Sequence, residues 1–165
     1  FLYFTQGCAL SCVTINRDTG ELKVDSTDIL MDLGRPVNKD LDLGQVSGAF
    51  IQGMGWVTSE NLFYNDEGLL LSHAPSTYKI PNIQDIPRDY NIELLENDEN
   101  YMNVRGTKAV GEPPLLLALS VWCAVQNALT YARKDKEYPK IKIPATNEEI
   151  LRSLEPETFK AWDSK

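Results

Sequence analysis

Two stretches near the start of the chain alternate between apolar and polar residues with a period of two. They cover residues 4–15 and 21–31, and the first is dominated by small and β-branched side chains. This alternation is typical of β-strands. Residues 16–20, Asn-Arg-Asp-Thr-Gly, have the composition of a short turn, and Gly34 and Pro36 favour an end to the second strand. We therefore predict a long antiparallel hairpin.

A helical spacing of apolar residues follows over residues 41–61. The positions that recur are Leu43, Val46, Ala49, Phe50, Gly53 and Val57. Asn38 or Asp40 is suited to cap this helix. It contains four glycines, Gly44, Gly48, Gly53 and Gly55. Each glycine costs a helix about 1 kcal/mol relative to alanine, so we expect a compensating close approach, either by another helix or by a large ligand lying against the backbone.

A second helix is predicted after Pro113 and Pro114, because proline suits the first helical turn and not the interior. From Leu115 to Ala132 apolar residues occupy almost every face. The polar interruptions are Ser120, Gln126, Asn127 and Thr130. The pattern predicts a core helix covered on most sides, too short and too interrupted to span a membrane.

Shorter elements lie between and after these two helices. A turn at residues 65–68 precedes a short strand at 69–72, a proline-punctuated extended passage covers 75–87, and a strand covers 90–95, followed by an acidic loop. Residues 133–142 form a charged linker. Thr146 and Glu149 resemble a capping box before a short helix that carries Ile150 and Leu154, and the last ten residues are expected to be a solvated tail. Together these elements predict an α+β fold.

Composition narrows the function classes. The 165 residues carry a net charge of −8 without a Lys/Arg cluster, which argues against binding to nucleic acid or an anionic membrane.

Cys8, Cys12 and Cys123 lack the spacing of a zinc or iron–sulfur site, and we expect Cys8 and Cys12 to be small core residues. Reduced thiols favour a cytoplasmic location. His73, the one histidine, is expected at the surface, and Tyr78 and Lys79 in structural roles.

Glu112 is the candidate catalytic residue. It precedes the proline pair, so it should lie at the N-terminus of the second helix, where unpaired N–H groups and the helix dipole favour an ionised carboxylate. Such a group can accept a proton. Gly111 allows close backbone approach to a ligand, and Gly106 can relax the turn before it. The alternative is that Glu112 only complements the helix terminus.

Three segments in order resemble one family. They are residues 108–114, Lys-Ala-Val-Gly-Glu-Pro-Pro; residues 44–53, Gly-Gln-Val-Ser-Gly-Ala-Phe-Ile-Gln-Gly; and residues 75–81, Pro-Ser-Thr-Tyr-Lys-Ile-Pro. Over about residues 1–132 the chain is similar to the xanthine dehydrogenase/xanthine oxidase family, the molybdenum hydroxylases. The resemblance implies that residues 1–165 are a C-terminal fragment of a larger molybdopterin-binding domain, and Phe1 in place of an initiator Met fits an excised segment.

The resemblance also implies roles and partners. Glu112 would be the base beside the molybdenum, and Gln45 would contact the pterin of the molybdenum cofactor, with Gln52 a weaker candidate; either glutamine could instead bind neighbouring backbone. No residue of the chain is expected to ligate the metal. Iron–sulfur clusters and FAD are expected on other domains or subunits, and the complete enzyme is expected to be a homodimer.

The expected reaction is hydroxylation of an sp² carbon with oxygen from water. Pro113 and Pro114 after the glutamate favour a xanthine/hypoxanthine dehydrogenase of purine catabolism. The alternatives are an aldehyde or N-heterocycle hydroxylase with the same chemistry, or an inert interaction subunit when the chain is isolated.

Overall fold

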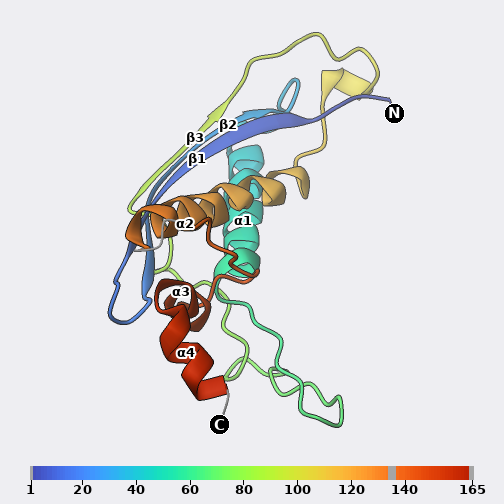
Figure 1. Ribbon diagram of the computed structural model, residues 1–165. Coiled ribbons are helices and arrows are strands. Elements are labelled where there is room, and N and C mark those ends of the chain that lie inside the picture. Colours follow the sequence, from blue (N-terminus) through green and yellow to red (C-terminus); the bar gives the residue numbers. More distant parts are fainter. Residues whose placement is uncertain (1, 134–136, 164–165) are drawn as a thin grey trace.

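The computed structural model describes residues 2–133 and 137–163, and its centre is a three-stranded sheet. The strands are β1 (Gln6–Ile15), β2 (Leu22–Asp32) and β3 (Asp89–Leu94), in the order β1-β2-β3. β1 and β2 form the predicted antiparallel hairpin, whereas β3 lies parallel to β2 (Figure 1). The parallel pairing requires the long connection between β2 and β3, which contains the glycine-rich helix.

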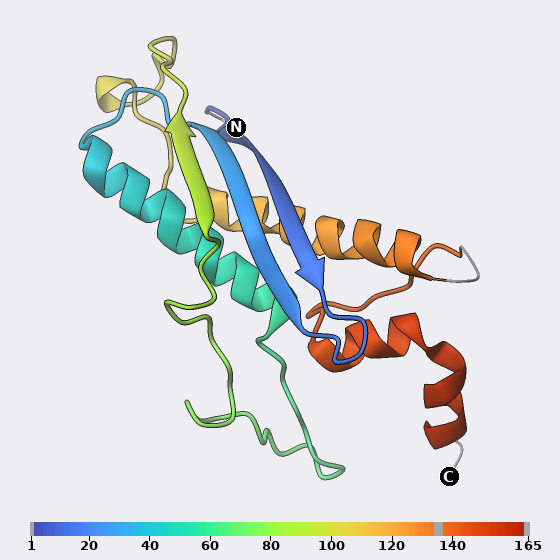
Figure 2. The same ribbon diagram turned by 90° about the vertical axis from the view of Figure 1, so that its left-hand side faces the viewer.

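Two helices cover one face of the sheet (Figure 2). They are α1 (Lys39–Thr58) and α2 (Leu119–Ala132), and α2 follows directly on a 3₁₀ helix, η2 (Pro113–Ala118). Apolar side chains from β2 and both helices form the main core, and Ala9 and Val13 of β1 pack against it. The core residues include Val24, Ile29, Met31, Val46, Phe50, Met54 and Val121. The mixed sheet and helices confirm the α+β prediction.

The N-terminus of α1 is capped as the sequence indicates. The side chain of Asn38 accepts hydrogen bonds from the backbone N–H groups of Asp40 and Leu41. On the sheet side, Tyr90 of β3 donates a hydrogen bond to the carbonyl of Ser47 at 3.2 Å, and burial raises the pKa of Tyr90 to about 12. These contacts fix the first half of α1 against the sheet.

The apolar helix after the proline pair differs from the prediction in two ways. By length and composition alone, Pro113–Ala132 could cross a membrane, with a mean hydropathy of 1.5, so the expectation that it is too short and too interrupted is wrong. It is also not covered on most sides. Ala118, Val121, Val125 and Leu129 are buried along one stripe, as in the core helix of a globular domain, while Leu116 and Tyr131 on other sides are exposed.

The opposite face of the sheet is open, which corrects the expectation for the cysteines. Residues Ala9 and Val13 of β1 point to the core, so the alternate positions Cys8 and Cys12 point outward and are exposed. Cys123 on α2 is exposed as well. Alternation placed these residues on a common face correctly, but that face has no cover within the described chain.

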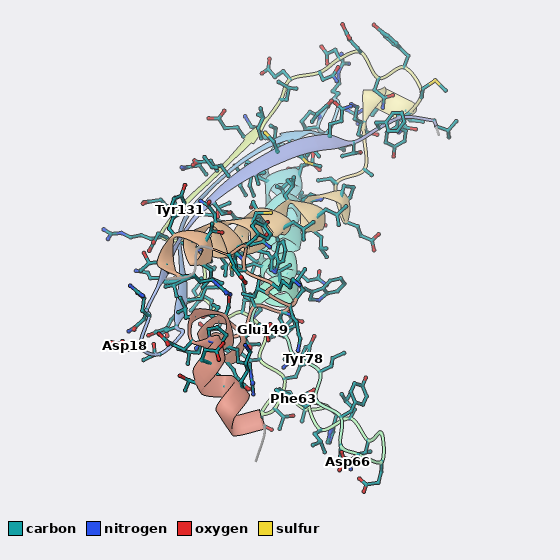
Figure 3. The ribbon with its side chains drawn as sticks, viewed as in Figure 1. Asp18, Phe63, Asp66, Tyr78, Tyr131 and Glu149 are labelled. Carbon is teal, nitrogen blue, oxygen red and sulfur yellow. The ribbon has the colours of Figure 1, made fainter. Side chains whose placement is uncertain are left out.

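An arm formed by residues 59–80 extends away from the sheet and its helices (Figure 3). The expected strand at residues 69–72 is wrong, because only one bridge, between Tyr64 and Leu70, forms there. The two ends of the arm are joined at its base, just beyond α1, since Tyr78 donates a hydrogen bond to Glu60 at 2.6 Å. Lys79 pairs with Asp85 at 2.7 Å.

The C-terminal part is more helical than predicted. Thr146 caps α3 (Asn147–Leu154) by accepting from the N–H of Glu149, but the Glu149 carboxylate accepts from the N–H of Lys142, so the capping box is not closed. Most of the expected solvated tail is helical, since α4 (Pro156–Asp163) forms there, although Glu157, Thr158 and Lys160 are exposed. Residues 134–136 of the predicted charged linker and residues 164–165 of the tail lie outside the described residues.

Candidate functional site

The chain approaches Glu112 through a turn at the end of the sheet. η1 (Val104–Gly106) contains two consecutive residues in the left-handed region, Arg105 with φ 61° and Gly106 with φ 73°. Glycine adopts such angles freely, while a side chain such as that of arginine rarely does. The turn reverses the chain so that the residues after it, which we call the Glu112 segment (residues 107–112), lie along the end of β2.

Backbone hydrogen bonds attach the Glu112 segment to the end of β2. The N–H of Lys108 donates to the carbonyl of Leu33 at 2.8 Å, and the N–H of Arg35 donates to the carbonyl of Gly106 at 3.0 Å. Gly34 lies between these bonds with φ 66°, and a β-carbon there would collide with the Gly106 carbonyl. Gly34 is thus required both for its own backbone angle and for the approach of the segment.

A buried ion pair reinforces this attachment. Nζ of Lys108 lies 2.5 Å from a carboxylate oxygen of Asp32, and the two side chains are only 9% and 8% exposed. Burial by itself would raise the pKa of Asp32, but the hydrogen bonds from Lys108 and from the N–H of Gly34 outweigh it and hold this pKa below its ordinary value. The Asp32 carboxylate is therefore ionised at neutral pH.

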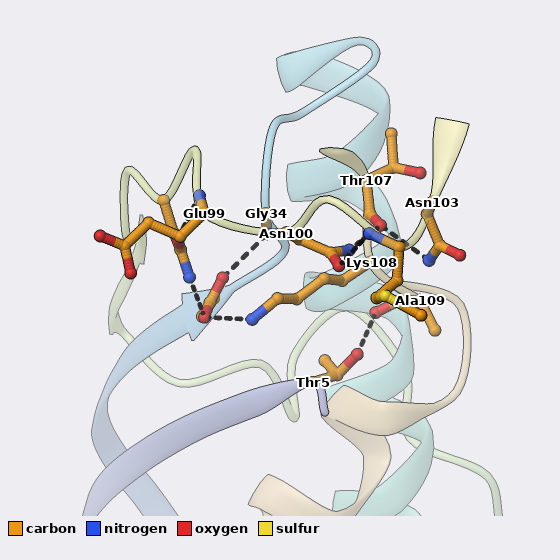
Figure 4. Close-up of polar contacts among 11 residues, drawn as sticks. Thr5, Gly34, Glu99, Asn100, Asn103, Thr107, Lys108 and Ala109 are labelled. Atoms are coloured by element: carbon orange, nitrogen blue, oxygen red, sulfur yellow. Dashed lines mark hydrogen bonds and ion pairs between the residues drawn. The ribbon is translucent and has the colours of Figure 1, made fainter. Parts of the chain in front are cut away.

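Asparagine side chains complete the polar network (Figure 4). Asn97 donates to the carboxylate of Asp32 at 2.8 Å. Asn100 and Asn103 both donate to the carbonyl of Thr107, at 2.7 and 2.9 Å. Since these residues come from the loop between β3 and the Glu112 segment, the loop that reads as merely acidic in the sequence supports the segment from its other side.

Glu112 itself is the N-cap residue of η2, and its side chain is exposed. Pro113 and Pro114 have no N–H to be capped, and the next N–H, that of Leu115, donates to the backbone carbonyl of Glu112 at 3.0 Å. The Glu112 carboxylate makes no capping hydrogen bond, nor any other polar contact with the part of the chain that the structure describes. The alternative that it merely complements the helix terminus thus has no contact to support it.

The structure brings Gln45 next to Gly111, the residue before Glu112. An ideal β-carbon at Gly111 would lie 3.8 Å from Oε1 of Gln45, so the amide of Gln45 faces the residue immediately before Glu112. Gly111 does not have a positive φ, unlike Gly106. Gln45 therefore lies close to the residue before the candidate base, although the two come from distant segments of the sequence, and Gln45 and Glu112 are both exposed. Gln52 is also exposed, two turns further along α1 from Gln45.

The four glycines of α1 divide into two kinds. A β-carbon at Gly53 would lie 2.8 Å from Cβ of Ala118 and even closer to the carbonyl of Leu115, and one at Gly55 would meet Glu60 and Pro81. At Gly44 and Gly48 a β-carbon would meet nothing within 4 Å. Packing against η2 therefore explains Gly53, and packing against Glu60 and Pro81 explains Gly55, whereas among the described residues no neighbour explains Gly44 or Gly48.

Gly44 and Gly48 belong to an exposed stripe of α1. With Leu41, Gln45 and Gln52 they recur at intervals of three and four residues, which places them on one side of the helix.

Within residues 2–133 and 137–163 no cluster of three or more His, Cys, Asp or Glu side chains could hold a metal ion. His73 is exposed, as expected, and its Nδ1 lies 2.9 Å from the carbonyl of Leu70 on the arm.

The reasoning from sequence missed the residues that hold the Glu112 segment, chiefly Asp32, Lys108 and Asn100. One signal was available. Asp32, Leu33 and Gly34 form an Asp-x-Gly pattern at the end of a strand, and an aspartate there can bind the N–H two residues on, as it does at 2.8 Å. The partner of that aspartate, distant in sequence, could not be found in the same way.

Comparison of the sequence with known proteins assigns the chain to a family. Residues 1–87 match the model of the molybdopterin cofactor-binding domain. The chain is 42% identical to the xanthine dehydrogenase/oxidase of Gallus gallus over 98% of its own length, and spans 13% of that relative.

Comparison with solved structures supports the same family. The chain is similar to quinoline 2-oxidoreductase from Pseudomonas putida 86, with a TM-score of 0.78 and 29% identity over 87% of the chain and 18% of that protein. Aldehyde oxidoreductase from Desulfovibrio gigas gives a TM-score of 0.73 and 28% identity over 94% of the chain and 16% of that protein. The chain belongs to the xanthine dehydrogenase family of molybdenum hydroxylases and forms part of a molybdopterin cofactor-binding domain.

Proposed function

We propose that this chain is a C-terminal piece of the molybdenum region of a xanthine/hypoxanthine dehydrogenase, in which Glu112 is the catalytic base and Gln45 contacts the pterin. The observation that carries the proposal is the juxtaposition of Gln45 and Gly111 beside a carboxylate that has no polar contact in the described chain. An exposed amide with a donor and an acceptor suits the edge of a pterin ring.

The surface around Gln45 fits a large flat group. Gly44 and Gly48 remove the side chains that would otherwise cover this stretch of α1, so a ligand could approach the helix backbone closely. The chain offers no metal-ligand cluster among its described residues, so it would hold the cofactor by its organic part. When bound, the cofactor supplies the two-electron oxidation and the position for oxygen derived from water.

The role proposed for Glu112 follows from its surroundings. A general base must be ionised and within hydrogen-bond reach of the proton that it accepts. The exposed Glu112 carboxylate has no polar partner among the described residues that would compete for that proton, and the amide of Gln45 faces the residue immediately before it. Glu112 would take the proton that the attacking oxygen loses, and later release it to water.

The complete site needs the rest of the protein. Gln45, Glu112 and the stripe of α1 that contains Gly44 all face outward from this chain, as do Leu116 and Leu119. We propose that the remainder of the molybdenum region covers these residues and completes the pocket, with iron–sulfur and flavin portions beyond it. The isolated chain would then be inactive.

Substrate class is tested on the full-length protein. We expect molybdenum by elemental analysis and a kcat/KM for xanthine at least about 10-fold above those for an aromatic aldehyde and for quinoline, a discrimination well within what buried hydrogen bonds to substrate provide. A preference for the aldehyde or quinoline would instead favour the alternative hydroxylase of the same chemistry. The absence of molybdenum from an active preparation would contradict both.

The open glycines give a separate test of the cofactor surface. In the full-length protein, Gly48→Ala should lower the molybdenum and pterin content per protein, because the new methyl group would occupy the space proposed for the cofactor. Alanine itself favours the helix by about 1 kcal/mol, so a loss of cofactor could not be attributed to a weaker α1. Gly68→Ala, in a turn of the arm, is the control and should retain full cofactor content.

A further inference from the structure

The Glu112 carboxylate has no polar contact of its own in the described chain, so its place is set by the backbone on either side. On the C-terminal side the backbone is fixed by packing. Pro114 is fully buried, and the carbonyl of Leu115 lies against Gly53 of α1. On the N-terminal side the backbone is fixed four residues earlier, at Lys108.

The fixation at Lys108 is mainly polar. Its N–H is bonded to Leu33, and its ammonium group is paired with Asp32 at 2.5 Å in a nearly closed environment. Within the described chain, one further polar contact reaches the residues between Lys108 and Glu112, a 3.3 Å hydrogen bond from the hydroxyl of Thr5, just before β1, to the carbonyl of Ala109. That bond is exposed and long, so the buried ion pair is the stronger of the two restraints.

We infer that Asp32 and Lys108 are positioning residues for the catalytic base: by fixing the start of the Glu112 segment to the end of β2, they set the location of the Glu112 carboxylate. The inference rests on the proposed role of Glu112. The carboxylate of Asp32 accepts hydrogen bonds from Lys108, Asn97 and the N–H of Gly34. The last two bonds keep the carboxylate in place if the lysine is displaced. The pair therefore defines one position for the segment.

The test must separate positioning from stability. Removing one partner would leave the other charge buried and uncompensated, so we would change both, as Asp32→Asn with Lys108→Met, in the full-length enzyme. The matched control is Arg35→Gln with Asp98→Asn. That pair joins the residues just after β2 to the loop before η1 at 3.1 Å, so it lies near the same end of the sheet, but its side chains are 61% and 74% exposed and should contribute little.

Three quantities are measured for each protein. They are molybdenum content, kcat per bound molybdenum with KM, and amide hydrogen exchange over residues 104–116 in molybdenum-free protein. We expect the double variant to show a kcat per molybdenum lower by about 10- to 100-fold, the size of effect that a displacement near 1 Å produces. KM should stay within about 2-fold, and exchange should be faster even without cofactor. The control should match the wild type.

The outcomes are distinguishable. Wild-type kcat per molybdenum in the double variant would overturn the inference, and a lower cofactor content alone would show a purely structural role. Unchanged exchange over residues 104–116 would overturn it as well. Glu112→Gln is measured in parallel: if that variant keeps wild-type kcat, the proposed function fails first, whereas if it is inactive while the double variant is fully active, only the positioning inference fails.

Discussion

Replacing Glu112 with Gln in the full-length enzyme should lower kcat by about 10²- to 10⁴-fold, the usual contribution of a positioned general base. The change keeps the shape of the side chain and removes its ability to accept a proton. Because the carboxylate makes no polar contact with the described residues, the fold should not depend on its charge. Molybdenum content should therefore equal that of the wild type.

The measurement is single-turnover oxidation of substrate by molybdenum-loaded protein, with metal content determined on the same sample. Glu99→Gln is the matched control, since Glu99 is an exposed carboxylate in the loop that leads to the Glu112 segment and should keep wild-type kcat. If fully loaded Glu112→Gln protein reacts within a few-fold of the wild-type rate, Glu112 is not the base.

Replacing Gly34 with Ala should destabilise the protein more than Gly48→Ala or Gly68→Ala. Two costs combine, namely about 1–2 kcal/mol for a left-handed backbone angle and about 1–3 kcal/mol for overpacking. The first arises from φ 66°, and the second from the collision of the new β-carbon with the carbonyl of Gly106. The collision is with backbone that is itself hydrogen-bonded to Arg35, so it cannot be relieved by a rotamer change.

Native-state hydrogen exchange in β2 and residues 104–112 measures this loss as a lower local unfolding free energy. Gly68→Ala is the matched control because Gly68 has a similar φ of 82° but open space around it. It should show only the conformational part, about 1–2 kcal/mol, at the arm. Equal losses at the two positions would mean that the segment does not press against Gly34.

The elements predicted from sequence depend on local patterns. Period-two alternation gave the hairpin and β3, helical spacing gave α1, and Asn38 is its cap. The helix after Pro113 starts where the prolines require it, although its first six residues are 3₁₀. Such features are set by neighbours within a few residues, so they can be recognised without knowledge of the fold.

The errors share a different origin. The sequence places Cys8 and Cys12 in the core and predicts that residues 115–132 are covered on most sides, because an apolar pattern indicates what a surface is suited to and not what lies against it. The arm lacks its expected strand because pairing there is limited to one bridge, between Tyr64 and Leu70. In each case the missing information is the identity of a neighbour distant in sequence or in another part of the protein.

The sequence by itself determined the family resemblance, the α+β class and the choice of Glu112 and Gln45, because each rests on a local pattern of residue types. Only the tertiary structure decided that Gln45 lies beside Gly111, that Lys108 pairs with Asp32, and that Gly53 is filled by packing while Gly48 is open. These contacts join residues from different elements. They depend on the parallel addition of β3 and on the packing of α1 against η2, which no local pattern specifies.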